Sequence, residues 1–297
     1  MFTDESASAQ PLIDVPSSIP QPLAQPSPTP TAIDPDNPPW GLLSAFIVWV
    51  LSVALLVVVP VILLIPYLIY KTGVQGSTVA LGDTNLIFIS ILGVLPSHLL
   101  TILLVWYVVT LGGSRPFWET LGWYWPADFG PWKTVGIAVL LLGFGWLITH
   151  YIGGAETQLD LIIKSSYKSR LIIAFMAAVT GPFVEELVYR GLLYPALQRV
   201  VGVALAVVIV SVLFAGVHVL QYFNNPGVIA VITILSVSLT IVRARTRSLL
   251  PAYVIHLVFN SLQAILLILQ PLIDKQQNRD SAVGALFNLF ATFFSSH

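Results

Sequence analysis

Seven long apolar segments separate the polar stretches of this sequence, and they restrict the folds that the chain can adopt. A helix needs about 20 apolar residues to cross the hydrocarbon core of a bilayer, and most of these segments approach or exceed that length. Only 9% of the 297 residues are charged, whereas an average soluble domain carries about 25%. The sequence therefore predicts an all-α, polytopic membrane helix bundle with about seven transmembrane helices and a short C-terminal interfacial helix. The predicted spans are Trp40–Tyr70, Leu86–Leu111, Thr134–Tyr151, Leu171–Gln198, Gly202–Leu220, Gly227–Val242 and Leu249–Ile273.

The other segments divide the chain into four parts. Residues 1–39 contain ten prolines and five acidic residues but no Lys or Arg, which predicts a disordered, Pro-rich acidic tail and no signal peptide. Residues 40–165 are expected to hold the N-terminal transmembrane helices and an interfacial segment. Residues 166–273 are expected to form the helix bundle that carries the chemistry. Residues 274–297 form the C-terminal interfacial part, because the apolar piece Ala282–Phe294 is too short to cross a bilayer.

Composition excludes several classes of function. The formal net charge of −1 gives no reason to expect a nucleic-acid partner. Because the chain has no cysteine, disulfides, thiol catalysis and thiolate metal sites are excluded. The basic residues of the loops divide evenly between the two sides, so the positive-inside rule does not decide the orientation. We expect a multi-pass protein of the cell (plasma) membrane, with the lipid bilayer as one of its partners.

The segment from Gly181 to Arg190 places three charged side chains inside the fourth predicted span. A charge at the centre of a bilayer-spanning helix costs roughly 2.5–3.5 kcal/mol, so the three need partners or a water-filled cavity. Glu186 and Arg190 are four residues apart with the Glu first, which is the favourable order for an ion pair on one helix face. Glu185 lies about 100° around the helix from Glu186. We therefore predict a supporting ion pair between Glu186 and Arg190, and a functional Glu185 outside that pair.

Three more polar residues occur in the later spans: His218 in the fifth, and His256 and Asn260 on one face of the seventh. A desolvated glutamate can act as a general base toward water, and a histidine can share that water or protonate a leaving amine. A His and an Asn one turn apart can stabilise a developing oxyanion. Peptide hydrolysis is the reaction that this set supports most directly, whereas each residue taken alone also fits a purely structural role.

Three motifs in these spans resemble those of the CPBP intramembrane peptidases, a family that includes type II CAAX prenyl endopeptidases and bacteriocin-processing or self-immunity proteins. The motifs are Glu185-Glu186-x-x-x-Arg190, Phe214-x-x-x-His218 and His256-x-x-x-Asn260. They cover roughly residues 170–270, and three motifs in order on separate apolar segments are more specific than any one alone. The resemblance implies an all-helical membrane fold with the site buried among the core helices. The sequence departs from the family pattern in the basic link Arg243–Pro251.

The resemblance also implies roles for the motif residues. Glu185 would activate a water together with His218, while His256 and Asn260 would stabilise the oxyanion. The substrate would be a peptide or a lipid-modified protein at the bilayer, such as a prenylated or bacteriocin-like one. The family is also described as metalloproteases, in which case Glu185, His218 and His256 would hold zinc. We favour a site without a metal or other cofactor, because the sequence has no H-E-x-x-H motif and Asn is a poor zinc ligand.

Two other functions and one geometric problem stay open at this point. A non-proteolytic immunity or scaffold protein would share the fold, and a proton-coupled transporter would use the same Glu and His as a relay, although no internal repeat typical of such carriers is found. The fifth and seventh predicted spans begin at the same side of the membrane. Counted from that side at ~1.5 Å per residue, His256 lies about 10 Å deep and His218 about 24 Å. Tilt, a late start of the fifth helix, or kinks near Pro182 and Pro251 would have to bring them together. His98 matches no motif and is interpreted as a packing donor.

Overall fold

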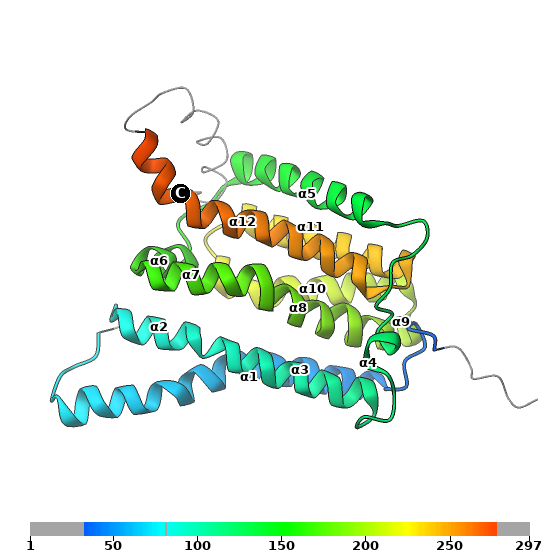
Figure 1. The fold of residues 1–297 in the computed structure, drawn as a ribbon, viewed down its shortest axis with the longest axis horizontal. Coiled ribbons are helices and arrows are strands. Elements are labelled where there is room, and N and C mark those ends of the chain that lie inside the picture. The colour runs from blue at the N-terminus through cyan, green and yellow to red at the C-terminus, as the bar shows by residue number, and fades with distance from the viewer. Residues whose placement is uncertain (1–32, 81, 278–297) are drawn as a thin grey trace, which may run out of the picture. The chain divides into compact units, whose positions relative to one another are not determined.

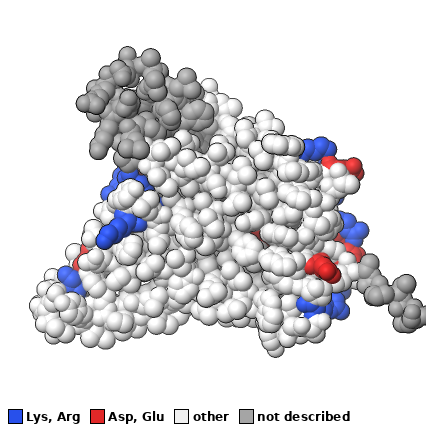
Figure 2. Space-filling view, in the orientation of Figure 1, with Lys and Arg blue, Asp and Glu red and all other residues white. Residues whose placement is uncertain are grey.

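The computed structural model describes residues 33–80 and 82–277, and every regular element within these residues is helical. Seven helical segments are long and apolar enough to cross a membrane, which confirms the predicted fold class. Figure 2 shows the charged side chains in two groups that are separated by a broad surface of uncharged residues. The protein is therefore an integral, multi-pass membrane protein. The predicted C-terminal interfacial piece, residues 282–294, lies outside the described residues.

The predicted spans agree with the observed helices to within a few residues at most ends. The short helices α4 (Phe117–Thr120) and α6 (Gln158–Ser165) lie in the connections between spans. The spans consist of α1 (Leu42–Ile69) with the π-helical η1 (Tyr70–Val74); α2 (Thr84–Leu92) and α3 (Val94–Thr110); α5 (Pro131–Ile152); α7 (Tyr167–Phe175), η2 (Met176–Thr180), α8 (Gly181–Glu186), η3 (Leu187–Leu193) and α9 (Tyr194–Val201); α10 (Val203–Tyr222); α11 (Pro226–Thr246); and α12 (Leu249–Gln277).

The fourth span, from α7 to α9, is the centre of the bundle (Figure 1). It contacts α1 and α3 on one side and α12 on another, and α12 in turn packs on α5 and α11. Every residue of η3 is buried, and so is the first half of α9. Because other helices rather than lipid surround this run, it can carry charged side chains that a lipid-facing helix would not tolerate.

Two π-helical segments interrupt the fourth span, and each ends two residues before a proline. Their last backbone hydrogen bonds reach back five residues, from Gly181 to Met176 in η2 and from Tyr194 to Tyr189 in η3. A proline ring clashes with the carbonyl four residues earlier and donates no hydrogen bond, so a widened turn before it relieves that clash. The two glutamates of the first motif therefore lie on α8, a short α-helical piece between two widened turns. Such π-helical turns occur often at functional sites.

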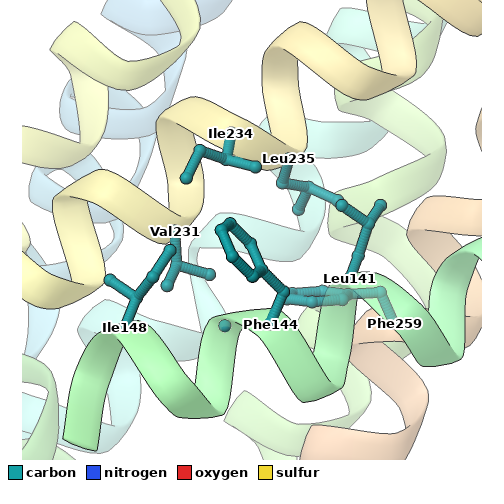
Figure 3. Close-up of a pocket in the computed structure, with 8 residues that line it drawn as sticks. Leu141, Phe144, Ile148, Val231, Ile234, Leu235 and Phe259 are labelled. Carbon is teal, nitrogen blue, oxygen red and sulfur yellow. The ribbon is translucent and has the colours of Figure 1, made fainter. Parts of the chain in front are cut away.

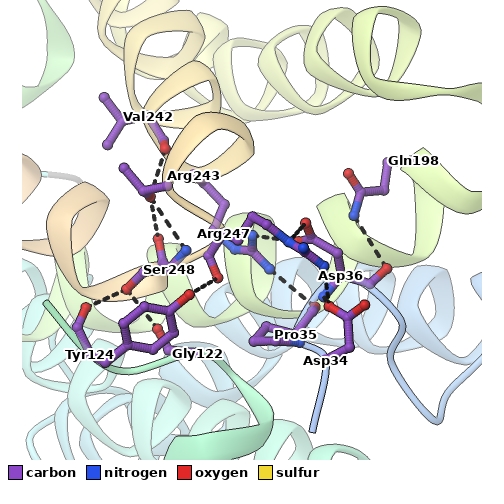
Figure 4. Close-up of polar contacts among 11 residues, drawn as sticks. Asp34, Pro35, Asp36, Gly122, Tyr124, Gln198, Val242, Arg243, Arg247 and Ser248 are labelled. Carbon is purple, nitrogen blue, oxygen red and sulfur yellow. Dashed lines mark hydrogen bonds and ion pairs between the residues drawn. The ribbon is translucent and has the colours of Figure 1, made fainter. Parts of the chain in front are cut away.

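The end of the predicted acidic tail contacts the bundle (Figure 4). Asp36 accepts hydrogen bonds from Arg243 at 2.7 Å and from Arg247 at 2.8 Å. Arg243 is fully buried and also donates to the carbonyl of Pro35. Asp34 pairs with Arg247 at 2.6 Å. The N–H of Asp36 and the Arg247 guanidinium hold the pKa of Asp34 below its usual value, so this carboxylate is charged at neutral pH.

Further hydrogen bonds join this segment to η3 and α9. They run from Gln198 to the carbonyl of Asp36, from Arg199 to the carbonyl of Pro38, and from the indole of Trp40 to the carbonyl of Leu192. Composition assigned residues 34–38 to a solvated tail, because a Pro-rich acidic stretch has little apolar surface to bury. The contacts instead come from α9 and η3 and from two arginines at the end of α11 and directly after it, Arg243 and Arg247.

Asp36 and Asp34 allow a matched test of this attachment. We expect Asp36→Asn to lower the stability of the protein by about 3 kcal/mol, because it leaves the charge of the buried Arg243 without its partner. Asp34→Asn should cost less than about 1 kcal/mol, since its ion pair is exposed to solvent. Thermal unfolding of both variants in detergent measures the difference. Equal unfolding temperatures for the two variants would contradict the role given to Asp36.

Candidate functional site

The two glutamates of α8 lie in different surroundings. The Glu186 side chain is 1% exposed, whereas that of Glu185 is 29% exposed. An offset of about 100° between successive helical residues accounts for the difference. Glu186 faces the packed interior of the bundle, and Glu185 faces a partly open region. The pair therefore provides one carboxylate with fixed partners and one that is accessible.

Glu186 is held by contacts from two helices. Its Oε1 accepts a hydrogen bond from Arg190 at 2.8 Å, within a salt bridge that is buried on both sides. The same oxygen lies 2.9 Å from Nδ1 of His256 on α12. Because a carboxylate facing a guanidinium is an acceptor only, Nδ1 of His256 is the donor in this contact. The sequence argument assigned Glu186 to Arg190 alone and missed the histidine.

Arg190 is fully buried, and its other N–H groups also have partners. Nε donates to the hydroxyl of Thr240 at 3.1 Å, and Nη2 donates to the hydroxyl of Ser236 at 2.7 Å and to its carbonyl at 2.9 Å. The guanidinium also lies over the ring of Phe214, with 4.7 Å from Cζ to the ring centroid. Sequence reasoning did not find the two hydroxyls, although two small polar residues four apart in an apolar span are a signal that could have found them.

Glu185 faces two imidazole rings. Its Oε1 is 3.9 Å from Nε2 of His218, and its Oε2 is 3.6 Å from Nε2 of His256. Nδ1 of His218 lies 2.8 Å from the carbonyl of Phe214, so it donates there. Both histidines thus have Nδ1 engaged as a donor, and both present Nε2 to the same carboxylate. A partner at one ring nitrogen fixes the role of the other, so in each neutral ring Nε2 is the acceptor nitrogen that faces Glu185.

The depth problem is solved by unequal starting levels of the helices. A late start of α10 is ruled out, because α10 begins at Val203. Leu249, the first residue of α12, instead packs against Gly191, and η3 and α9 continue beyond that level before α10 returns. At ~1.5 Å per residue, the chain runs about 18 Å outward from Gly191 to Val203. It then runs roughly 22 Å inward along α10 from Val203 to His218, so most of this inward distance is offset. The two histidines therefore reach similar depths.

Asn260 lies one turn beyond His256 but does not join this group. Its side-chain amide donates to the carbonyl of Ala177 in η2 at 3.0 Å. Among the described residues it makes no hydrogen bond with Glu185 or with either histidine of the motifs.

A third histidine contacts the same widened turn from the other side. Nδ1 of His98 on α3 lies 2.8 Å from the hydroxyl of Thr180, the last residue of η2. This contact agrees with the interpretation of His98 as a packing donor. Together with Asn260 it attaches η2 to α3 and α12, directly before the helix that carries the glutamates.

The apolar pocket in Figure 3 is separate from these residues. It is a small hollow between α5, α11 and α12. Its walls are Leu141, Phe144, Gly145, Ile148, Val231, Ile234, Leu235 and Phe259. Because no wall residue carries a polar side chain, the pocket offers apolar contact and no catalytic chemistry.

Glu185, His218 and His256 are ligand types that zinc accepts, and histidines that bind zinc usually donate from the other ring nitrogen. In the described part of the chain, however, no group of three His, Cys, Asp or Glu side chains is arranged to hold a metal ion. The donor set therefore matches zinc in chemical type, with Glu185 3.9 Å from Nε2 of His218 and 3.6 Å from Nε2 of His256.

Residues 167–262 match the family model described as type II CAAX prenyl endopeptidase Rce1-like. This region of the chain is similar to the CAAX peptidase (CPBP) family. The match runs from α7 into α12 and includes all three motifs, which confirms the resemblance inferred from them. Comparison with curated proteins and with solved structures gave no match. A CAAX peptidase of this type is an intramembrane endopeptidase, and the roles of single residues rest on the geometry above.

The two glutamates should differ in their effect on stability. Glu186→Gln is expected to lower the free energy of unfolding by about 3–5 kcal/mol, because it leaves the buried Arg190 charge uncompensated. Glu185→Gln should change stability little, since Glu185 is partly exposed and its imidazole contacts are longer than hydrogen bonds. Unfolding of both variants in detergent provides the comparison. A larger loss in Glu185→Gln would mean that the assignment of the two carboxylates is reversed.

Proposed function

We propose that the protein hydrolyses a peptide bond of a membrane-associated substrate through a water activated by Glu185 and His218. The observation that carries the proposal is the position of Glu185 between Nε2 of His218 and Nε2 of His256, at 3.9 and 3.6 Å. These separations leave the three groups close enough for one water oxygen to contact all of them. In the described chain, no Lys or Arg forms a salt bridge with Glu185. Its carboxylate can therefore accept a proton.

In the first step Glu185 takes a proton from the water, and the hydroxide oxygen attacks the carbonyl carbon of the scissile bond. His218 has its Nδ1 proton on the carbonyl of Phe214, so its Nε2 lone pair orients or shares the same water. General base catalysis of this kind contributes typically 10²–10⁴-fold. The proton then passes to the leaving nitrogen as the carbon–nitrogen bond breaks, which gives a carboxylic acid and an amine, and the acid then gives its proton to the amine.

The oxyanion of the tetrahedral intermediate needs donors, and His256 is the nearer candidate. Its Nδ1 donates to Glu186, so Nε2 becomes a second donor when the ring is protonated. Asn260 supplies a further donor through its second amide N–H. Each oxyanion donor contributes about 2.7–4 kcal/mol in well-studied hydrolases.

The substrate class follows from the family and from the location of the site. Residues 167–262 match a family of prenyl endopeptidases, and the catalytic group lies on helices that are long and apolar enough to cross a membrane. We propose a prenylated or bacteriocin-like peptide that approaches from the bilayer, cleaved without a metal, by a protein of the cell membrane. A non-proteolytic immunity or scaffold protein is the competing reading of the same fold.

Glu185→Gln should abolish hydrolysis while the protein stays folded. We expect a loss of at least about 100-fold in kcat, because the base that activates the water is removed. The measurement is turnover of prenylated and unmodified peptides by the purified protein in lipid. Glu119→Gln, an exposed glutamate on α4, is the matched control and should keep full activity. Equal turnover by wild type and Glu185→Gln would end the assignment of Glu185, and no turnover by wild type would favour the scaffold function.

The metal-free part of the proposal has its own test. Activity should persist with a strong chelator, and the double variant Glu185→Gln/His218→Ala should be no slower than Glu185→Gln alone, because the two residues act on one water. Loss of activity with chelator that zinc restores would show instead that Glu185, His218 and His256 hold a metal.

A further inference from the structure

Two hydroxyl groups on α11, those of Ser236 and Thr240, lie in the buried interior of an apolar span. Both are fully buried and both point at the guanidinium of Arg190. A serine and a threonine here are not required by packing, because an apolar side chain of similar volume fills the same space without a polar group to satisfy. Their position four residues apart places both on the face of α11 that meets η3.

We propose that Ser236 and Thr240 are positioning residues that align His256 through Arg190 and Glu186. This inference rests on the proposed peptidase function. Arg190 is planar, with N–H donors in a fixed fork. Thr240 binds Nε and Ser236 binds Nη2, at 3.1 and 2.7 Å, so two points on the guanidinium are fixed from α11. Fixing the plane in this way directs Nη1 toward Glu186.

The alignment passes from Arg190 to the reacting group through one carboxylate oxygen. Oε1 of Glu186 accepts from both Nη1 of Arg190 and Nδ1 of His256, so a rotation of the guanidinium moves the acceptor that orients the imidazole. Nε2 of His256 then lies 3.6 Å from Glu185. The two hydroxyls touch no reacting atom, and their effect on catalysis is exerted through the placement of His256.

Removal of the hydroxyls leaves the ion pair in place. In Ser236→Ala/Thr240→Val, Arg190 keeps Glu186 and the backbone carbonyl of Ser236 as partners. The buried charge therefore stays compensated, and the protein should fold. What is lost is the orientation of the guanidinium, and a misplacement of about 1 Å in a catalytic group can cost about 100-fold in rate. We expect kcat to fall at least ~10-fold and KM to stay within ~2-fold of wild type.

The experiment measures kcat and KM of peptide cleavage per folded molecule, with thermal unfolding in detergent as the check on folding. Thr240→Ser keeps a hydroxyl and should retain most of the activity that Thr240→Val loses. Thr233→Val is the matched control on the same helix, because the Thr233 hydroxyl bonds to the carbonyl of Ile229 within α11. It should leave kcat unchanged. If the double variant does not fold, the comparison of Thr240→Val with Thr240→Ser decides.

The outcomes separate this inference from the proposed function. Cleavage by wild type that disappears in Glu185→Gln, together with the loss of kcat and its recovery in Thr240→Ser, supports the positioning role. The same Glu185-dependent cleavage with unchanged kcat in Ser236→Ala/Thr240→Val overturns the positioning role alone. Equal kcat losses in Thr240→Val and Thr240→Ser also overturn it. Absence of any Glu185-dependent cleavage in wild type overturns the proposed function on which the inference rests.

Discussion

The buried ion pair between Glu186 and Arg190 is the contact on which the rest of this structure depends. Two charges in the interior of a membrane bundle are tolerated only when they are paired and hydrogen-bonded. Oε1 of Glu186 and the guanidinium meet this requirement with groups from neighbouring helices: the hydroxyls of α11 and an imidazole of α12, while an aromatic ring of α10 lies against the guanidinium. The need to compensate two charges therefore brings together the same helices that supply the candidate catalytic residues.

The asymmetry of the two glutamates follows from this arrangement. Glu186 is enclosed by its partners, whereas Glu185, the residue before it on the helix, stays partly exposed. Both histidines around Glu185 have Nδ1 engaged, one by a backbone carbonyl and one by Glu186. In the proposed mechanism, structure and chemistry divide between adjacent residues: Glu186 supports the site and Glu185 reacts.

Much of the fold could be predicted from the sequence, because span length and the i, i+4 spacing are local properties. They located all seven spans and the pairing of Glu186 with Arg190. Contacts between helices could not be predicted in the same way. The bond from His256 to Glu186 depends on the rotation and relative level of α12, and the level of His218 depends on how far α9 extends before α10 returns. The attachment of Asp36 to Arg243 joins residues more than 200 positions apart, and composition alone gave no sign of it.

The most direct test of the central claim is the protonation and contact of the His256 ring in the protein reconstituted in bilayers. Solid-state NMR with ring-¹⁵N histidine and carboxyl-¹³C glutamate gives both, with His256 assigned by its loss in His256→Gln. We predict a protonated Nδ1 in close contact with a glutamate carboxyl carbon, in wild type and equally in Glu185→Gln, because Glu186 is the partner. An unprotonated Nδ1, or a contact that vanishes in Glu185→Gln, would contradict the account.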